Sequence, residues 1–337
     1  MNNDNPVFKD KPRHPARAAI SPNPNPAPGA VEGRQGDGPF LSPFSGGSMS
    51  QPGQAVMRSA VWNRQKAYML RMLVRFGAVV TAASLLFIVT YILVMGIPHL
   101  SLDLFALPYN SVNVSLMPAL INTLLMTVFS LALAIPLGIG AAIYLVEYTG
   151  RGNKLVGIVR MTAETLTGIP SIVYGLFGLL FFVTALKWRI SLIAGAFTLA
   201  IMILPIIMRT AEEALKAVPD SYREGSFSLG AGRLRTVFNV LLPAAIPGIL
   251  AGVILGIGRI FGESAALIYT AGTVADIPHS VFDSTRTLSV HMYVLASEGL
   301  HIDKTYATAV VLLVFVVAIN ALSAVVARRI TKGSADA

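Results

Sequence analysis

The fold of this chain is organised around residues 211–247, which read AEEALKAVPDSYREGSFSLGAGRLRTVFNVLLPAAIP. This interval is polar and charged, whereas the stretches on either side of it are strongly apolar. It cannot cross a bilayer, because each charged side chain at the bilayer centre costs about 2.5–3.5 kcal/mol on insertion scales. Its small residues are nevertheless spaced too regularly for a slack loop. We therefore predict a docking helix outside the membrane, through which another protein drives this one.

The apolar stretches around this interval define the class of the protein. The 337 residues are 54% hydrophobic and only 13% charged, and the mean hydropathy is +0.66. A helix of about 20 apolar residues crosses the roughly 30 Å hydrocarbon core of a membrane. We therefore predict an all-α integral membrane protein with six transmembrane helices, at about residues 76–97, 116–146, 168–186, 191–208, 244–269 and 306–326.

The distribution of basic residues predicts the orientation of these six helices. Lys and Arg gather before the first helix, at 151–160, at 209–235 and at 328–332. The alternate segments carry only a few, namely Lys187, Arg189, Arg286 and Lys304. Cytoplasmic segments are the ones enriched in Lys and Arg. Both termini and the docking segment are therefore predicted to be cytoplasmic.

The first 70 residues differ in composition from the remainder. They are rich in Pro, Gly, Ser and Asn and include the run SPNPNPAPGA. Such a composition offers no apolar face that could offset the entropy lost on ordering. We predict a disordered cytoplasmic tail at 1–70, passive rather than a docking element, and a transmembrane domain at 71–330.

The fifth predicted helix carries two features of interest. Gly248, Gly252 and Gly256 recur every four residues, which favours close packing against another helix. Arg259 and Glu263 also lie four residues apart, so they are expected to share one helical face inside the membrane. One interpretation is an ion pair that only fixes helix packing. The other is a substrate pathway in which Arg259 meets an anion and Glu263 orients or releases Arg259.

Several kinds of chemistry are excluded by the residues present. The chain has no cysteine, no P-loop of the form GxxxxGK[ST], no HExxH and no GxSxG. We therefore expect no metal site, no cofactor and no catalytic residues, and any ATP dependence must come from a partner. The net charge of +9 suits anionic lipid headgroups of the bilayer, and nucleic acid is not an expected partner.

The docking segment resembles the EAA motif of membrane subunits of ABC importers. The residues that carry the resemblance are Glu224-Gly225-Ser226, Gly230, Val240 and Leu242-Pro243, with Gly and Ser in place of two alanines. In that family the motif forms a short cytoplasmic coupling helix that docks in a cleft on the ATPase subunit. The resemblance implies that Glu224 offers a charge to that partner and that Gly230 permits the turn.

Longer stretches resemble the PstA-type permeases of phosphate ABC importers. They include NTLLMTVFSLALAIPLGIGAAIYLVEY, GIPSIVYGLFGLLFFV, GRIFGESAAL and TRTLSVHMYVLASEG, within a core at about 117–328 whose coupling loop is at about 211–243. The resemblance implies a type I ABC importer (MetI-like) transmembrane fold in the bacterial inner membrane. It also implies a heterodimer with a sister permease, two ATPase subunits, an extracytoplasmic phosphate-binding protein, and Arg259 and Glu263 in the phosphate pathway.

Three alternatives stay open at this point. In the first, the chain is an importer subunit whose substrate is another oxyanion, such as phosphonate, sulfate or molybdate. A secondary transporter would use Glu263 or Glu164 as a proton relay, but it leaves the docking segment unexplained. A membrane-embedded enzyme lacks a catalytic set. The favoured hypothesis is a non-enzymatic subunit that moves phosphate by alternating access while separate subunits hydrolyse ATP.

Overall fold

The computed structural model describes residues 52–149 and 153–335 and divides the chain into two units, residues 1–69 and 70–337. Of the first unit, only the start of the long helix α1 is described; most of the predicted tail lies outside the described residues. All regular elements in the described ranges are helical, which confirms the predicted all-α fold class.

The helices follow one another in a simple order along the chain. The α-helices are α1 (Pro52–Gly96), α2 (Met117–Ile143), α3 (Lys154–Thr167), α4 (Ser171–Gly178), α5 (Leu192–Ala217), α6 (Asp220–Ser228), α7 (Arg233–Thr236), α8 (Leu242–Gly262), α9 (Ala265–Thr270), α10 (Leu288–Glu298) and α11 (Ile302–Ala335). Two short 3₁₀ helices, η1 (Ile97–His99) and η2 (Leu102–Phe105), precede α2. Three π-helical segments, η3 (Tyr144–Tyr148), η4 (Leu179–Ala185) and η5 (Val237–Leu241), continue α2, continue α4 and lead into α8.

Within the described ranges, five helical stretches are long and apolar enough to cross a membrane, and a sixth candidate is a bent pair of helices. The third predicted span, residues 168–186, is wrong in shape. Its helix begins earlier, as α3, and turns by 102° before α4. The break falls at Gly168-Ile169-Pro170, because a proline disfavours helical geometry in the residue before it. The fifth predicted span also differs, since α8 ends at Gly262 and residues 265–270 form the separate helix α9.

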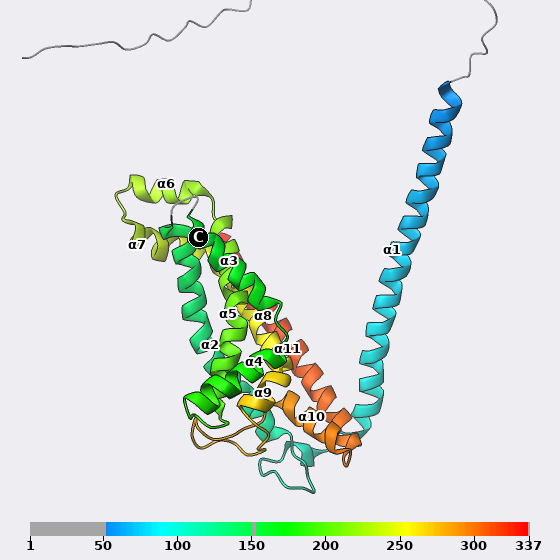
Figure 1. Ribbon diagram of the computed structural model, residues 1–337, viewed down its shortest axis with the longest axis vertical. Helices are drawn as coiled ribbons and strands as arrows, with labels where there is room; N and C mark the ends of the chain where they lie inside the picture. The colour runs from blue at the N-terminus through cyan, green and yellow to red at the C-terminus, as the bar shows by residue number, and fades with distance from the viewer. Residues whose placement is uncertain (1–51, 150–152, 336–337) are drawn as a thin grey trace, which may run out of the picture. The chain divides into compact units, whose positions relative to one another are not determined.

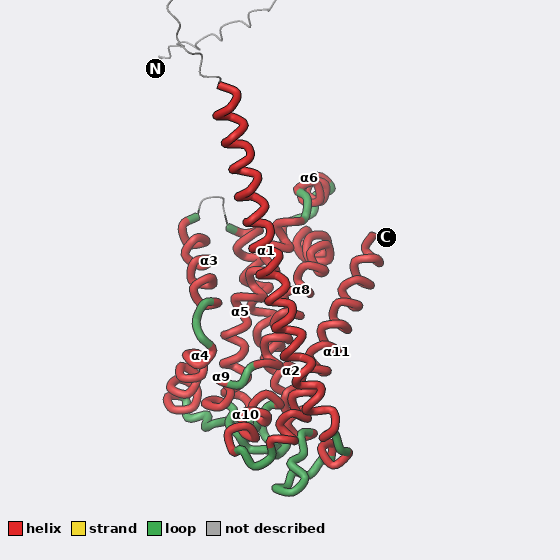
Figure 2. The backbone as a smooth tube through the Cα atoms, turned by 90° about the vertical axis from the view of Figure 1, so that its right-hand side faces the viewer, coloured by secondary structure: helices red, strands yellow, loops and turns green. Residues whose placement is uncertain are grey.

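Helix α5 forms the centre of the second unit. Figures 1 and 2 show it between its neighbours, and it packs most extensively against α2 and α8. Its small residues Ala194, Gly195 and Ala196 are buried, as are Leu199 and Ile203. Small residues let helix backbones approach closely where lipid offers no hydrophobic drive for association. Helix α5 therefore contributes to the buried apolar clusters along its length, while a separate cluster around Leu104, Leu116 and Leu288 lies apart from it.

The glycines of α8 confirm the predicted packing role. A Cβ atom at Gly248 would lie 2.6 Å from the Ala214 Cβ of α5, and one at Gly252 would lie 1.7 Å from Thr210 Oγ1. At Gly256 the nearest atoms are 3.9 Å away, in side chains that include Ile203. The close contact between α5 and α8 therefore depends on Gly248 and Gly252.

Replacing Gly252 by alanine is expected to destabilise the protein by about 1–3 kcal/mol, the usual range for overpacking. The new methyl group meets Thr210 Oγ1, whose hydroxyl is held 2.9 Å from Ile206 O, and Thr210 Cβ at 2.7 Å. Thermal unfolding of the purified protein measures the effect. The matched control is Gly140→Ala in α2, because a Cβ there meets nothing within 4 Å. A Gly252→Ala protein as stable as the control would contradict the packing argument.

The second unit presents different elements at its two ends (Figure 1). Helices α6 and α7 lie at one end, which we call the α6 end. Helices α9 and α10 lie toward the other, together with the segment between η1 and α2; this is the α10 end. The predicted coupling residues are at the α6 end, while Arg259, in the last turn of α8, and Glu263, directly after it, are toward the α10 end.

Candidate functional site

The predicted coupling residues Glu224, Gly225 and Ser226 lie on the short helix α6, which has no buried residue. Pro219 precedes the helix, and Asp220 in its first turn interacts favourably with the helix dipole. Tyr222 on this helix is 51% exposed, and Leu229, directly after it, is 90% exposed. An exposed helix with large apolar side chains at the end of a membrane bundle is typical of a docking surface.

The turn after α6 requires glycine at one position. Gly230 has φ +81°, a left-handed conformation that favours glycine, and its N–H donates to Phe227 O at 2.9 Å. The chain then reverses into α7, and Ser226 Oγ lies 2.8 Å from Thr236 Oγ1, which joins the two helices. Leu242 and Pro243 begin α8, where the missing N–H of a proline is harmless.

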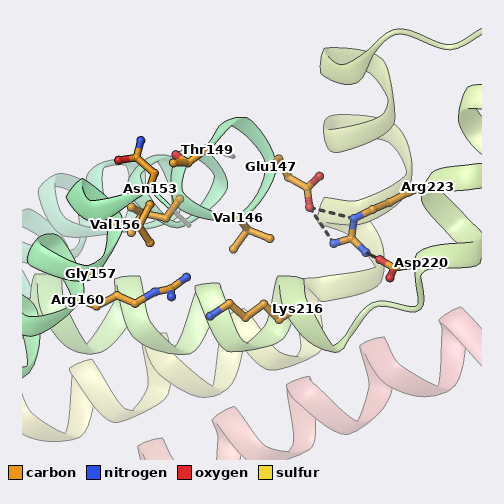
Figure 3. A pocket seen from close by; sticks show the side chains of 11 residues that line it. Val146, Glu147, Thr149, Asn153, Val156, Gly157, Arg160, Lys216, Asp220 and Arg223 are labelled. Carbon is orange, nitrogen blue, oxygen red and sulfur yellow. Dashed lines mark hydrogen bonds and ion pairs between the residues drawn. The ribbon is translucent and has the colours of Figure 1, made fainter. Parts of the chain in front are cut away.

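Arg223 fastens α6 to the membrane helices and was not recognised as a site from the sequence. All five of its N–H groups are used. Its Nε and Nη2 donate to Glu147 Oε1 at 3.2 and 2.8 Å, drawn as dashed lines in Figure 3. Its Nη1 donates to Asp220 Oδ1 at 3.1 Å and to Val218 O at 2.9 Å, and its Nη2 also donates to Leu215 O at 3.0 Å.

This arrangement joins three elements through one side chain. Glu147 belongs to η3 at the end of α2, and Leu215 belongs to the last turn of α5. The Arg223 and Glu147 side chains are only 16% and 11% exposed, so solvent screens the ion pair weakly. Arg223 therefore connects α6 to the end of α2 and to the last turn of α5.

A cavity of about 730 Å³ lies beside this contact, between η3, α3, α5 and α6. Arg160 of α3 and Lys216 of α5 line it, as Figure 3 shows. Both pair with the buried carboxylate of Glu212, at 2.5 and 2.6 Å. Arg160 thus pairs with another helix rather than with Glu164, four residues further on, which lies 3.7 Å from Arg209. Glu212 thus ties α3 to the end of α5.

Arg259 and Glu263 are not arranged as their spacing predicts. Helix α8 ends at Gly262, and Glu263 has extended backbone geometry, so the two side chains do not share a helical face. Glu263 Oε1 instead accepts the N–H of Ala266 at 3.1 Å, and Glu263 O accepts Ser289 Oγ at 2.5 Å. Glu263 thereby holds the starts of α9 and α10. Arg259 is exposed and forms no ion pair with any acid in the part of the chain that the structure describes.

Comparison with known proteins identifies the family. The model described as "Binding-protein-dependent transport system inner membrane component" matches residues 134–332. The chain is 34% identical to the probable ABC transporter permease protein YqgI of Bacillus subtilis, over 66% of this chain and 81% of that protein. It is 39% identical to the phosphate transport system permease protein PstA of Pasteurella multocida, over 56% of this chain and 71% of that one.

The fold agrees with a solved importer. A structure of the inward-facing MetNI methionine ABC transporter matches with a TM-score of 0.50 at 22% identity, over 64% of this chain and 94% of that chain. Permeases of this family are multi-pass inner-membrane subunits that work with a second permease, a binding protein and separate ATPase subunits. The alternatives of a secondary transporter and of a membrane enzyme are thereby excluded. The chain belongs to the family of binding-protein-dependent transport system inner membrane components, as a PstA-type permease subunit of an ABC importer.

Proposed function

We propose that this permease forms half of a pathway for inorganic phosphate across the bacterial inner membrane. The observation that carries the proposal is the similarity to permeases described as phosphate transport proteins, at 39% identity for the one from Pasteurella multocida. The exposed, unpaired guanidinium of Arg259 within the described chain supports it chemically. A guanidinium presents parallel N–H donors to two oxygens of a tetrahedral oxyanion.

Arg259 and Glu263 have different roles in this proposal. Arg259 contacts the anion, because its side chain is exposed and is not neutralised by a neighbouring acid in the described residues. Glu263 has a structural role beside the pathway, because its carboxylate accepts the N–H of Ala266 in α9 and its carbonyl accepts a hydrogen bond from Ser289 Oγ in α10. Glu263 therefore sets where α8, α9 and α10 meet, and does not release Arg259 by pairing with it.

Energy enters through the α6 end, which is cytoplasmic in this proposal, as are both termini. The docking residues are Glu224, Gly225, Ser226, Gly230, Leu242 and Pro243. Two ATPase subunits approach each other on binding ATP, α6 moves with one of them, and the membrane helices rearrange to open outward. A phosphate-binding protein delivers the anion on the other side, and the sister permease supplies the second half of the pathway.

Competition between anions tests the substrate. The complete transporter is reconstituted in vesicles with its binding protein, and ATP-driven uptake of radiolabelled phosphate is measured against unlabelled phosphate, a phosphonate, sulfate and molybdate. We expect unlabelled phosphate alone to compete at equal concentration. Failure to take up phosphate would contradict the proposed substrate. Stronger competition by one of the other anions would identify that anion as the substrate instead.

A further inference from the structure

A second arginine, Arg286, is buried at the α10 end without an acidic partner. Only 4% of it is exposed, and it lies in the segment between α9 and α10. Its Nε and Nη2 have no hydrogen-bond partner in the described part of the chain, and none of the ion pairs found there includes it. Two parallel N–H donors are thus held inside the protein with nothing to receive them.

The surroundings hold this guanidinium in place without neutralising it. The Tyr109 ring lies over it, with its centroid 4.6 Å from the Arg286 Cζ. The backbone is fixed on both sides, because Arg286 N donates to Val274 O at 2.9 Å and Arg286 O accepts Asn122 Nδ2 at 3.3 Å. The side chain is therefore a fixed donor fork rather than a mobile surface arginine.

Neighbouring polar atoms are also without partners. Thr285 Oγ1 and Asn122 Oδ1 are buried and make no hydrogen bond in the described residues. His291 also belongs to this cluster; it is fully buried, and its ring lies edge-on to Tyr109 with a centroid distance of 6.2 Å. Burial and the charge of Arg286 lower the pKa of His291 to about 3, so this histidine is neutral and Arg286 carries the only charge of the cluster.

A buried charge with unsatisfied donors is unfavourable unless an opposite charge compensates it. Because so little of Arg286 is exposed, a carboxylate carried on the surface of a partner protein does not reach its fork. A small anion that is enclosed with it does. The Tyr109 ring, which lies over the guanidinium, is itself partly exposed.

We infer that Arg286 and Thr285 bind one tetrahedral oxyanion in an enclosed site at the α10 end, covered by Tyr109. Arg286 Nε and Nη2 donate to two of its oxygens, and Thr285 Oγ1 donates to a third. The identity of the ligand rests on the proposed function. The anion is the transported phosphate, which binds at Arg286 after it leaves the binding protein and before it reaches Arg259.

The connection to Arg259 runs through hydrogen bonds. Thr287 Oγ1 lies 3.2 Å from Ser289 Oγ, which in turn donates to Glu263 O at 2.5 Å. The segment that carries Arg286 is thus attached to the residue that follows the last turn of α8. Phosphate bound at Arg286 is positioned to affect the end of the helix that presents Arg259.

Thermal unfolding with inorganic phosphate as the probe tests the site. The sample is the purified complex of both permeases and the ATPase subunits, without the binding protein, whose own phosphate site would mask the effect. We expect phosphate to raise the unfolding temperature of the wild-type and Arg259→Gln complexes, and not to raise that of the Arg259→Gln/Arg286→Gln complex. Arg189→Gln, which changes an exposed arginine near the same end, is the control and keeps the response.

A second variant guards against misfolding. Arg286→Lys keeps the charge but loses the fork, so we expect an assembled complex whose apparent phosphate affinity is at least tenfold weaker. A phosphate response that survives in the double variant overturns the site. So does a wild-type complex that responds to no oxyanion. A response to sulfate or molybdate alone that disappears with Arg286→Gln supports the site and contradicts the phosphate function.

Discussion

Replacing Arg223 by alanine is expected to reduce ATP-driven uptake at least tenfold while ATP hydrolysis continues. The change removes four hydrogen bonds that join α6 to Glu147 and to the carbonyls of Leu215 and Val218, and a fifth to Asp220 within α6. The ATPase subunits still hold α6, but its motion no longer reaches α2 and α5. Uptake and hydrolysis are measured in the same vesicles, at equal amounts of assembled complex.

The loss of stability must be separated from the loss of coupling. Breaking a buried ion pair typically costs about 3–5 kcal/mol, because the remaining charge is left unpaired. Arg223→Lys keeps the charge and part of the contact, so it is expected to be intermediate in uptake and nearly normal in assembly. Arg235→Ala, which removes an exposed arginine of α7, is the matched control. Normal uptake by an assembled Arg223→Ala complex would show that α6 drives the bundle by another route.

Replacing Arg259 by glutamine is expected to reduce uptake at least tenfold with little effect on stability. Arg259 forms no ion pair within the described residues, so its loss leaves no acid unpaired. What is lost is a charge-assisted contact with the substrate anion, worth about 1.5–3 kcal/mol for a hydrogen bond to a charged group. The measurement is the initial rate of phosphate uptake as a function of external phosphate, with binding protein in excess.

Two further variants help to interpret the result for Arg259→Gln. Arg259→Lys retains the charge without the fork and is expected to keep part of the uptake. Glu263→Gln keeps one acceptor oxygen for the Ala266 N–H, so it tests whether Glu263 acts as a cap or as a charge. Wild-type uptake by a stable Arg259→Gln complex would remove Arg259 from the pathway.

The long apolar runs predicted most of this fold from the sequence. Spans close to those expected occur at α1, α2, α5, α8 and α11, because hydrocarbon admits few other structures for such segments. The polar interval from Ala211 to Pro247 was also informative. It contains a separate exposed helix and a glycine, Gly230, that has the expected left-handed turn geometry.

The positions at which helices stop were harder to predict. The sequence predicted no helix before Gly168-Ile169-Pro170, where α3 ends, and the predicted fifth span runs across Gly262-Glu263, although α8 ends there. At the first site proline geometry decides, and at the second the carboxylate of Glu263 takes the N–H of Ala266 to begin a new helix. Apolar composition indicates whether a segment enters a membrane, but it carries little information about where a helix within the membrane ends or bends.

The ion pairs between helices could not be predicted from the spacing of charged residues along the sequence. Arg160 and Glu164 satisfy the i, i+4 rule, yet Arg160 turns to Glu212 of another helix. Arg223 and Glu147 are separated by 76 residues, and no sequence pattern joins them. Partly buried ion pairs are chosen by the tertiary packing that excludes water from them, so they become visible only in three dimensions.

The bonds from Arg223 to Leu215 O and Val218 O have a consequence for folding as well. The last four carbonyls of an α-helix have no N–H donor within the helix itself. At the end of α5, the carbonyls of Leu215 and Val218 accept N–H groups of Arg223 from the following helix. Unwinding of α6 would therefore leave both carbonyls without this donor. An insertion between Val218 and Asp220 would separate the cap from its helix, which makes the length of this short connection as constrained as any residue in it.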